Sequence, residues 1–353
     1  MIDIYGTLGP ACADRKILGE MLSLGMTGMR LNLSHMTLPE AAPMIRLLKD
    51  AAGDAGVRPQ LLIDMQGPEL RTGVLPEPLD LSEGTSVRLA CTGTPAQLLP
   101  GTCTPVQELP QIPVPDAVLS ALTPGQEILL DDGKLLLKIT EVSGSGGRKD
   151  LPVTAAAEVI RGGTLQSRKS IALPGVRVDS PAMTETDREN LRFAKEYGVT
   201  AVMQPFVRSP EDLKTVRAAL NETGCGDIRL FAKIENTDGI RMIESLIPEA
   251  DEIVIARGDL GNAMPLWELP RVQKQIAAAC RKAGRPFMVV TQMLASMEHR
   301  SVPTRAEVSD IFNAVLDGAA SVMVTGETAV GDYPVEVIRY LANTVREALA
   351  YMG

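Results

Sequence analysis

Short apolar runs recur along the chain, and most are followed by a stretch with helical periodicity. The predicted strands are Ile2–Tyr5, Gly28–Leu33, Leu61–Met65, Thr200–Met203, Ile228–Ile234, Ile253–Ala256, Phe287–Thr291 and Ser321–Val324. Predicted amphipathic helices between them are Ala13–Leu24, Leu38–Ala52, Glu185–Tyr197, Ser209–Asn221 and Leu266–Ala283. Strand alternating with helix predicts a parallel sheet, and eight such units predict a closed (β/α)8 TIM barrel. A last helix near Val335–Tyr351 would complete the ring.

One segment, roughly Gly67–Ser170, breaks this rhythm. It is rich in Pro and Gly, and its short runs at 87–92, 127–140, 151–160 and 162–175 are typical of hairpins and small-barrel strands. Asp132-Gly133 is a hairpin-turn dipeptide, and 143–147 predicts a flexible tip. A decorative insertion is one interpretation. Because the segment leaves the C-terminal end of a barrel strand, a mobile lid over the barrel mouth is the favoured one.

We therefore predict an α/β protein with two parts. Residues 1–67 and 171–353 would form a catalytic (β/α)8 barrel, and residues 68–170 would form an inserted β-rich lid domain, a small β-barrel.

Composition excludes several classes of function. The net charge of −9 argues against a broad nucleic-acid-binding surface, and 3% aromatic residues argue against base-stacking platforms. The five cysteines are scattered without a CxxC motif, which indicates reduced thiols in a cytoplasmic protein. With two histidines, a His/Cys zinc site is not expected. We find neither a signal peptide nor an apolar run long enough to span a membrane.

Polar side chains gather at the ends of two predicted strands. Arg30, Asn32 and Ser34 alternate with leucines, so they point to one side of their strand. A strand end running into solvent would give the same pattern. Asp64, however, ends the next strand, and neighbouring strand ends would place Asn32, Ser34 and Asp64 within reach of one cation. Oxygen ligands of this kind suit a hard monovalent or divalent ion.

A second group follows three later strands. Lys233 and Glu235 share one face of a strand, where a buried structural ion pair is the alternative interpretation. Asp259 follows the next strand, so two carboxylates would converge, as a Mg²⁺ that keeps several waters requires. Backbone N–H groups of the turn at 258–261 can hold a carboxylate or phosphate. Thr291 ends another strand, and its hydroxyl would face the same mouth.

At these residues the sequence resembles the pyruvate kinase family. The matching blocks are TLGPA (7–11), GMRLNLSH (28–35), IDMQGPELRTG (63–73), LLDDGKLLLKI (129–139), SRKSIALPG (167–175), FAKIEN (231–236), ARGDLG (256–261), TQMLASM (291–297), PTRAEVSDIFNAVLDGA (303–319) and GETAVGDYP (326–334). The resemblance implies a glycolytic transferase that moves the phosphoryl group of phosphoenolpyruvate to ADP, giving pyruvate and ATP.

The resemblance also implies a metal site and a phosphoryl site. Glu235 and Asp259 would bind Mg²⁺ (or Mn²⁺), and Lys233 and Arg30 would stabilise the transferring phosphoryl group. The family's K⁺ site would be formed by the side chains of Asn32, Ser34 and Asp64 with the carbonyl of Met65.

Substrate contacts are implied in the same way. The backbone N–H groups of Gly258 and Asp259, with Thr291, would bind the phosphoenolpyruvate carboxylate, and Thr291 would orient a proton-donating water. Nucleotide contacts are expected at Arg71, His35 and Lys169.

The sequence departs from the family at Gln66, where lysine is common, at Gln204-Pro205 in place of Ala-Ser, and at Met36 and Val330. The sequence ends at Gly353, so we expect the family's C-terminal regulatory domain to be absent, while a homodimer through the barrel stays open. Two alternatives keep the enolate site. One is a Mg²⁺-dependent carbon–carbon lyase, an aldolase or another enol-phosphate kinase, and the other is a non-catalytic phosphoenolpyruvate-binding paralogue.

Overall fold

The structure, a computed structural model, describes residues 2–34, 36–91, 109–131, 133–143, 153–176, 178 and 180–353. By its internal contacts the chain divides into two units. The first unit comprises Met1–Pro68, Pro181–Gly261 and Trp267–Gly353, and the second comprises Glu69–Ser180 and Asn262–Leu266. Whether the two units are the separate domains expected from the sequence stays a prediction.

Among the described residues of the first unit, eight parallel strands close a barrel in the order β1-β16-β15-β14-β13-β12-β3-β2. These strands are β1 (Asp3–Thr7), β2 (Gly28–Asn32), β3 (Gln60–Asp64), β12 (Ala201–Gln204), β13 (Arg229–Ile234), β14 (Glu252–Ala256), β15 (Phe287–Val290) and β16 (Ser321–Met323). The barrel is sealed where β1 pairs with β16, in the register Asp3↔Ser321. The predicted (β/α)8 barrel is confirmed, with each strand within a few residues of its expected place.

The strands are apolar because both of their faces are buried. Large side chains such as Tyr5, Leu62 and Phe231 fill the barrel interior and are fully buried. Tyr5 lies against Gly28, where a Cβ atom would collide with the Tyr5 ring. The barrel is therefore a packed core, and chemistry is confined to its ends.

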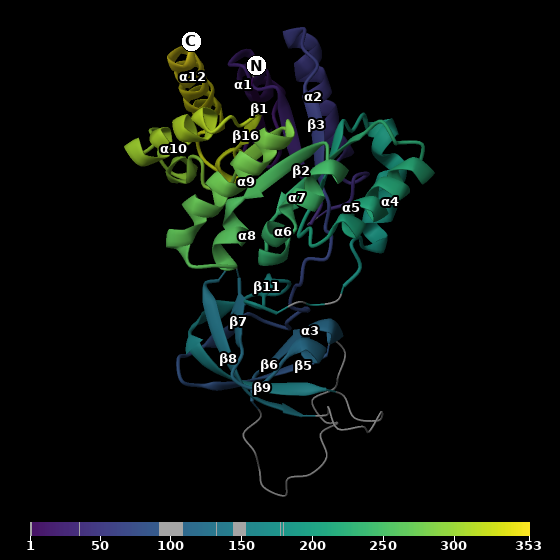
Figure 1. The fold of residues 1–353 in the computed structure, drawn as a ribbon, viewed down its shortest axis with the longest axis vertical. Coiled ribbons are helices and arrows are strands. Elements are labelled where there is room, and N and C mark those ends of the chain that lie inside the picture. The colour runs from purple at the N-terminus through teal and green to yellow at the C-terminus, as the bar shows by residue number, and fades with distance from the viewer. Residues whose placement is uncertain are drawn as a thin grey trace, which may run out of the picture. The chain divides into compact units, whose positions relative to one another are not determined.

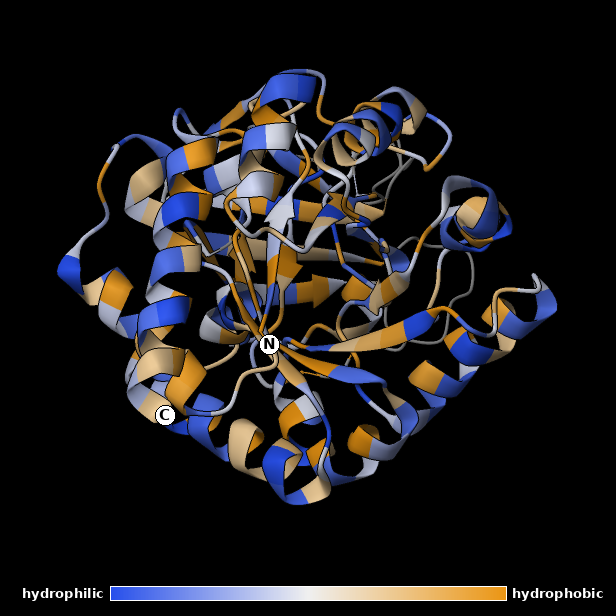
Figure 2. Cartoon of the chain, turned by 90° about the horizontal axis from the view of Figure 1, so that it is seen from above, coloured by the Kyte–Doolittle hydropathy of each residue, from blue (hydrophilic) through white to orange (hydrophobic). Residues whose placement is uncertain are grey.

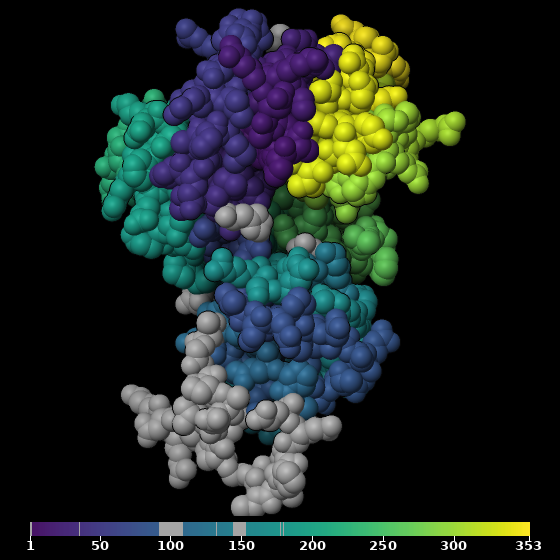
Figure 3. All heavy atoms as spheres, turned by 180° about the vertical axis from the view of Figure 1, so that it is seen from behind, coloured from purple at the N-terminus to yellow at the C-terminus, as the bar shows by residue number. Residues whose placement is uncertain are grey.

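Helices surround the strands and turn their polar faces outward, as Figure 2 shows. They are α1 (Arg15–Ser23), α2 (Ala42–Ala55), α4 (Glu185–Tyr197), α5 (Pro210–Glu222), α6 (Thr237–Arg241), α7 (Ile243–Leu246), α8 (Arg257–Asn262), α9 (Leu269–Ala283), α10 (Arg305–Leu316), α11 (Gly326–Ala329) and α12 (Pro334–Met352), with short 3-10 turns at η1 (Ile247–Glu249), η2 (Leu266–Glu268) and η3 (Ala295–Glu298). In Figure 3 the purple N-terminal residues lie beside the yellow helix α12, which packs against α1 and β1.

Two helices begin later than the sequence pattern predicts. α2 was expected from Leu38 and α9 from Leu266, but both begin next to a proline in the first turn, Pro43 and Pro270. Proline lacks the N–H that a helix interior needs, and its fixed φ suits the first turn, so it sets the helix start.

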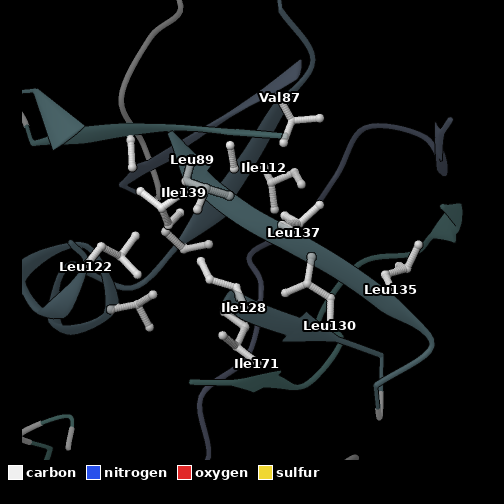
Figure 4. Packing of buried hydrophobic residues seen from close by; sticks show 14 of the residues in the cluster. Val87, Leu89, Ile112, Leu122, Ile128, Leu130, Leu135, Leu137, Ile139 and Ile171 are labelled. Carbon is white, nitrogen blue, oxygen red and sulfur yellow. The ribbon is translucent and has the colours of Figure 1, made fainter. Parts of the chain in front are cut away.

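Among the described residues of the second unit, six strands form a sheet in the order β11-β7-β8-β9-β5-β6. Its strands are β5 (Ser86–Cys91), β6 (Gln111–Val114), β7 (Glu127–Leu130), β8 (Leu135–Ser143), β9 (Thr154–Arg161) and β11 (Ile171–Ala172), accompanied by the pair β4 (Leu79–Leu81) and β10 (Gly163–Leu165) and by helix α3 (Asp116–Ala121). Alternate residues of β8, such as Leu135, Leu137 and Ile139, point into one apolar core (Figure 4).

The β7–β8 hairpin predicted for 127–140 is present, with Leu130 opposite Leu135. The expected turn residue Asp132 and most of the expected tip at 143–147 lie outside the described residues. Within the part of the chain that the structure describes, Cys12, Cys91, Cys225 and Cys280 form no disulfide. Searching the described part of the chain for a helix able to cross a bilayer gave no candidate.

Candidate active site

Strands β2 and β3 are neighbours in the barrel (Figure 1). Four charged residues meet at the C-terminal ends of β2, β3 and β13. The Asp64 carboxylate accepts from Arg30, at 2.7 Å from Nη2, and from Lys233, at 3.0 Å from Nζ. Lys233 Nζ also lies 3.0 Å from Glu235 Oε1. A side chain on β13 thus reaches Asp64 past the intervening strand β12, which requires that both point into the barrel mouth.

Burial and charge act against each other in this cluster. Burial alone would raise the pKa of Asp64, but Lys233 and Arg30 outweigh it and hold that pKa below its ordinary value. Burial alone would lower the pKa of Lys233. The Asp64 and Glu235 carboxylates outweigh burial and raise that pKa above its ordinary value. Both groups are therefore charged at neutral pH, and the ammonium group is fixed in place.

Glu235 behaves differently. Burial raises its pKa to about 7, and the nearby negative charges of Asp259 and Asp64 act in the same direction, against the opposing effect of Lys233. Its second oxygen, Oε2, accepts from the backbone N–H of Phe206 at 2.7 Å. The negative charge of Asp259 acts on Lys233 as well, which places this carboxylate in the same electrostatic neighbourhood.

Helix α8 begins directly where β14 ends, which brings Gly258 and Asp259 to the barrel mouth. A Cβ atom at Gly258 would lie 2.8 Å from Cγ2 of Thr291, so this position needs a glycine. The side chain of Thr291 therefore lies against the backbone of the turn that carries Asp259.

Thr291 is not the last residue of its strand, although the sequence predicts this. Strand β15 ends at Val290, and Thr291 follows it. Its φ is 78° and that of Gln292 is 55°, both in the left-handed region that a β-branched residue rarely adopts. Arg257 holds the strained turn, because its guanidinium donates to the Thr291 carbonyl at 2.7 and 3.1 Å. Asp310 fixes Arg257 in turn, at 2.6 Å. Strained backbone that is held in this way is typical of functional sites.

The residues expected to bind K⁺ lie on adjacent strands. Asn32 is paired with Asp64 in the β2–β3 register, and its Oδ1 accepts from the backbone N–H of Ser34 at 3.1 Å. Met65 is buried directly after Asp64. The Asp64 carboxylate already contacts Arg30 and Lys233, so a cation here would share that charge.

The donor set at Glu235 and Asp259 fits a magnesium ion. Within the described residues no group of three or more His, Cys, Asp or Glu side chains could hold a metal. Two carboxylates nevertheless suffice for Mg²⁺, which keeps several waters and also binds substrate oxygens. A bound cation would also offset the burial and the carboxylate repulsion that together raise the pKa of Glu235.

Arg71 and Lys169 belong to the second unit, where residues 71 and 170 form an antiparallel bridge. Arg71 donates to the carbonyl of Arg168 at 2.8 Å and pairs with Glu69. Lys169 Nζ lies 2.9 Å from Asp131. The structure thus brings two of the expected nucleotide contacts onto neighbouring segments, and the third, His35, lies outside the described residues.

Sequence reasoning missed several residues around these groups. Thr7 accepts from Arg30 at 3.5 Å, Phe206 donates its backbone N–H to Glu235, and Asp131 neutralises Lys169. Thr7 ends the observed strand β1, two residues beyond the predicted strand Ile2–Tyr5, so a longer predicted strand would have found it. The roles of Phe206 and Asp131 depend on φ angles of 50° and on contacts that no sequence pattern displays.

A closed parallel barrel with a buried lysine between carboxylates at its strand ends defines a protein of the (β/α)8 enzyme class. The family model described as pyruvate kinase, barrel domain, matches residues 1–338. The chain is 37% identical to the pyruvate kinase of Corynebacterium efficiens, over 98% of the chain and 69% of that protein. It is 36% identical to that of Bacillus licheniformis, over 96% of the chain and 56% of that protein.

The chain therefore belongs to the pyruvate kinase family. It spans between 55% and 69% of the length of the curated relatives it matches. The family resemblance inferred from the sequence motifs is confirmed.

Proposed function

We propose that the chain transfers the phosphoryl group of phosphoenolpyruvate to ADP, giving pyruvate and ATP. The observation that carries this proposal is the ammonium group of Lys233, held between Asp64 and Glu235 beside the guanidinium of Arg30. Phosphoryl transfer needs fixed positive charge where negative charge develops, and little covalent chemistry from the protein.

In the proposed reaction an ADP phosphate oxygen attacks phosphorus, and the bond from phosphorus to the enol oxygen breaks. Lys233 and Arg30 stabilise the charge on the transferring group, while backbone N–H groups of Gly258 and Asp259 hold the substrate carboxylate. The enolate then takes a proton from a water oriented by the Thr291 hydroxyl. Arg71 and Lys169 would contact the nucleotide, as would His35.

Two cations complete the proposal. Glu235 and Asp259 would hold Mg²⁺ or Mn²⁺, which would neutralise charge on the phosphoryl oxygens. Asn32, Ser34, Asp64 and the Met65 carbonyl would hold K⁺. A homodimer through the barrel and a cytoplasmic location, which rests on the scattered cysteines, are part of the same proposal.

The test is a pyruvate-formation assay with purified protein, Mg²⁺, K⁺, ADP and phosphoenolpyruvate. We expect pyruvate and ATP in equal amounts, and slower turnover when tetramethylammonium replaces K⁺. Pyruvate chemistry that proceeds without nucleotide would reject the kinase in favour of a lyase or aldolase. Binding of phosphoenolpyruvate without turnover would identify a non-catalytic paralogue.

A further inference from the structure

The polypeptide passes between the two units at four places, two of which, Pro68–Glu69 and Ser180–Pro181, enclose residues 69–180 of the second unit. The segments next to these passages in the first unit, 65–68 and 181–184, are far apart in sequence. Both are bonded to the same small group of buried side chains, which the proposed chemistry does not use.

Asp187 joins the two segments through one carboxylate. This residue is completely buried in the first turn of α4. Its Oδ1 accepts from the backbone N–H of Gln66 at 2.8 Å, and its Oδ2 accepts from those of Gly67 and Thr184, each at 2.9 Å. A capping box explains only the bond from Thr184. The bonds from Gln66 and Gly67 tie the other segment to the same oxygens.

The side chain of Gln66 adds a second bridge. Its Nε2 donates to the carbonyl of Leu33 at 3.2 Å, and its Oε1 accepts from the hydroxyl of Thr184 at 3.2 Å. A lysine, the residue common at this position in the family, has no acceptor for the Thr184 hydroxyl. The bridge to Thr184 therefore depends on a glutamine at position 66.

Gln204 lies between the segments at the end of β12. Its Nε2 donates to the carbonyl of Ala182 at 2.7 Å and to that of Pro205 at 3.2 Å. Gly67, at φ 57°, packs so closely on the Pro205 ring that a Cβ atom there would collide with it. Gln204 is fully buried, and among the described residues its Oε1 has no hydrogen-bond partner. An unsatisfied buried oxygen costs free energy, so the contribution of this amide to the structure comes from the two hydrogen bonds that its Nε2 donates.

We propose that Gln66, Gln204 and Asp187 act together as positioning residues, which we call the connection anchor. The anchor holds the segments 65–68 and 181–184 together on one region of the barrel wall, and these segments enclose residues 69–180 of the second unit. This inference rests on the proposed function, because Arg71 and Lys169, the proposed nucleotide contacts, are carried by the attached unit. Loosening the anchor should therefore weaken nucleotide use and spare phosphoenolpyruvate binding.

The test variant is Gln204→Met, which keeps the side-chain length and removes both donated bonds. Its matched control is Gln273→Met, since Gln273 is another buried glutamine of the first unit, on helix α9. Gln66→Met is the second variant if Gln204→Met does not fold. Amide hydrogen exchange of the ligand-free protein is measured at 65–68 and 181–184, followed by the KM values for ADP and phosphoenolpyruvate.

We expect faster exchange at both segments in Gln204→Met and not in Gln273→Met. The KM for ADP should rise about fivefold, which corresponds to one of the two lost hydrogen bonds, the one to Ala182 in the segment 181–184. The KM for phosphoenolpyruvate should be unchanged. Equal exchange in the two variants, or equal changes in the two KM values, would overturn the anchor. The exchange measurement needs no turnover, so an inactive wild type would refute the proposed function and leave the anchor to be judged by exchange alone.

Discussion

Replacing Lys233 with methionine removes the cation at the centre of the candidate active site and keeps the side-chain volume. In the wild type its Nζ lies 3.0 Å from Asp64 and 3.0 Å from Glu235. Asp64 keeps Arg30 at 2.7 Å in the variant, so its charge stays paired. Glu235 loses its cation, and because its pKa is already about 7, it takes up a proton.

The size of the effect follows from these contacts. Breaking a buried ion pair costs about 3–5 kcal/mol when a charge is left unpaired. Since Glu235 can be neutralised, we expect the variant to lose about 3 kcal/mol of unfolding free energy at about pH 8. At about pH 6 the loss should be smaller, because Glu235 is already largely protonated in the wild type. Loss of a fixed cation at the phosphoryl group should lower kcat by about a hundredfold to a thousandfold.

Urea unfolding at the two pH values and steady-state assays at saturating substrate measure both quantities. Lys274→Met is the control, because Lys274 is exposed, pairs with the partly buried Asp317 and lies outside the candidate active site. A folded Lys233→Met protein with kcat within about tenfold of wild type would refute the catalytic assignment. A stability loss that is equal at both pH values would refute the account of Glu235.

Three further predictions concern the metal, the pH dependence of stability and the substrate turn. Mg²⁺ must displace the proton of Glu235, so the apparent Kd for Mg²⁺ should fall about tenfold per pH unit up to about pH 7 and be constant above that pH. Thermal-shift titration across this range measures the slope. A Kd that does not change with pH would contradict the prediction. Without metal, the raised pKa means that Glu235 adds stability below its ordinary pKa of 4.5, and that this is lost as the pH rises through about 7. Gly258→Ala should lower kcat/KM for phosphoenolpyruvate about tenfold or more, because the new Cβ would lie 2.8 Å from Thr291. The control is Gly53→Ala, where no atom lies within 4 Å of the new Cβ, and it should leave kcat/KM unchanged.

The barrel could be predicted from the sequence because a parallel strand buried on both faces leaves a continuous apolar run. Charges at the ends of such runs, as at Asp64 and Lys233, stand out against that background. The register then brings Asn32 beside Asp64 without further information. This much of the candidate site follows from periodicity and the rule that parallel strand ends share one rim.

Other features depend on contacts between distant segments. The left-handed turn at Thr291 exists because Arg257 and Asp310 hold it, and no local pattern marks a threonine for that conformation. Asp187 looks in sequence like a helix-capping residue, and its bonds to Gln66 and Gly67 appear only when the barrel has formed. Strand β6 and helix α3 were missed because the Pro-rich segment around them lacks a clear period.

The pairing of β1 with β16 has a consequence for synthesis on the ribosome. The strand at residues 3–7 emerges before the other strands of the barrel, yet its partner at 321–323 is made some three hundred residues later. Until then one edge of β1 carries unsatisfied backbone N–H and C=O groups, a template for pairing with other chains. Contacts of such long sequence separation also form slowly. Translation must therefore nearly reach helix α12 before the sheet can lose its open edges, and the nascent chain is most prone to aggregation in that interval.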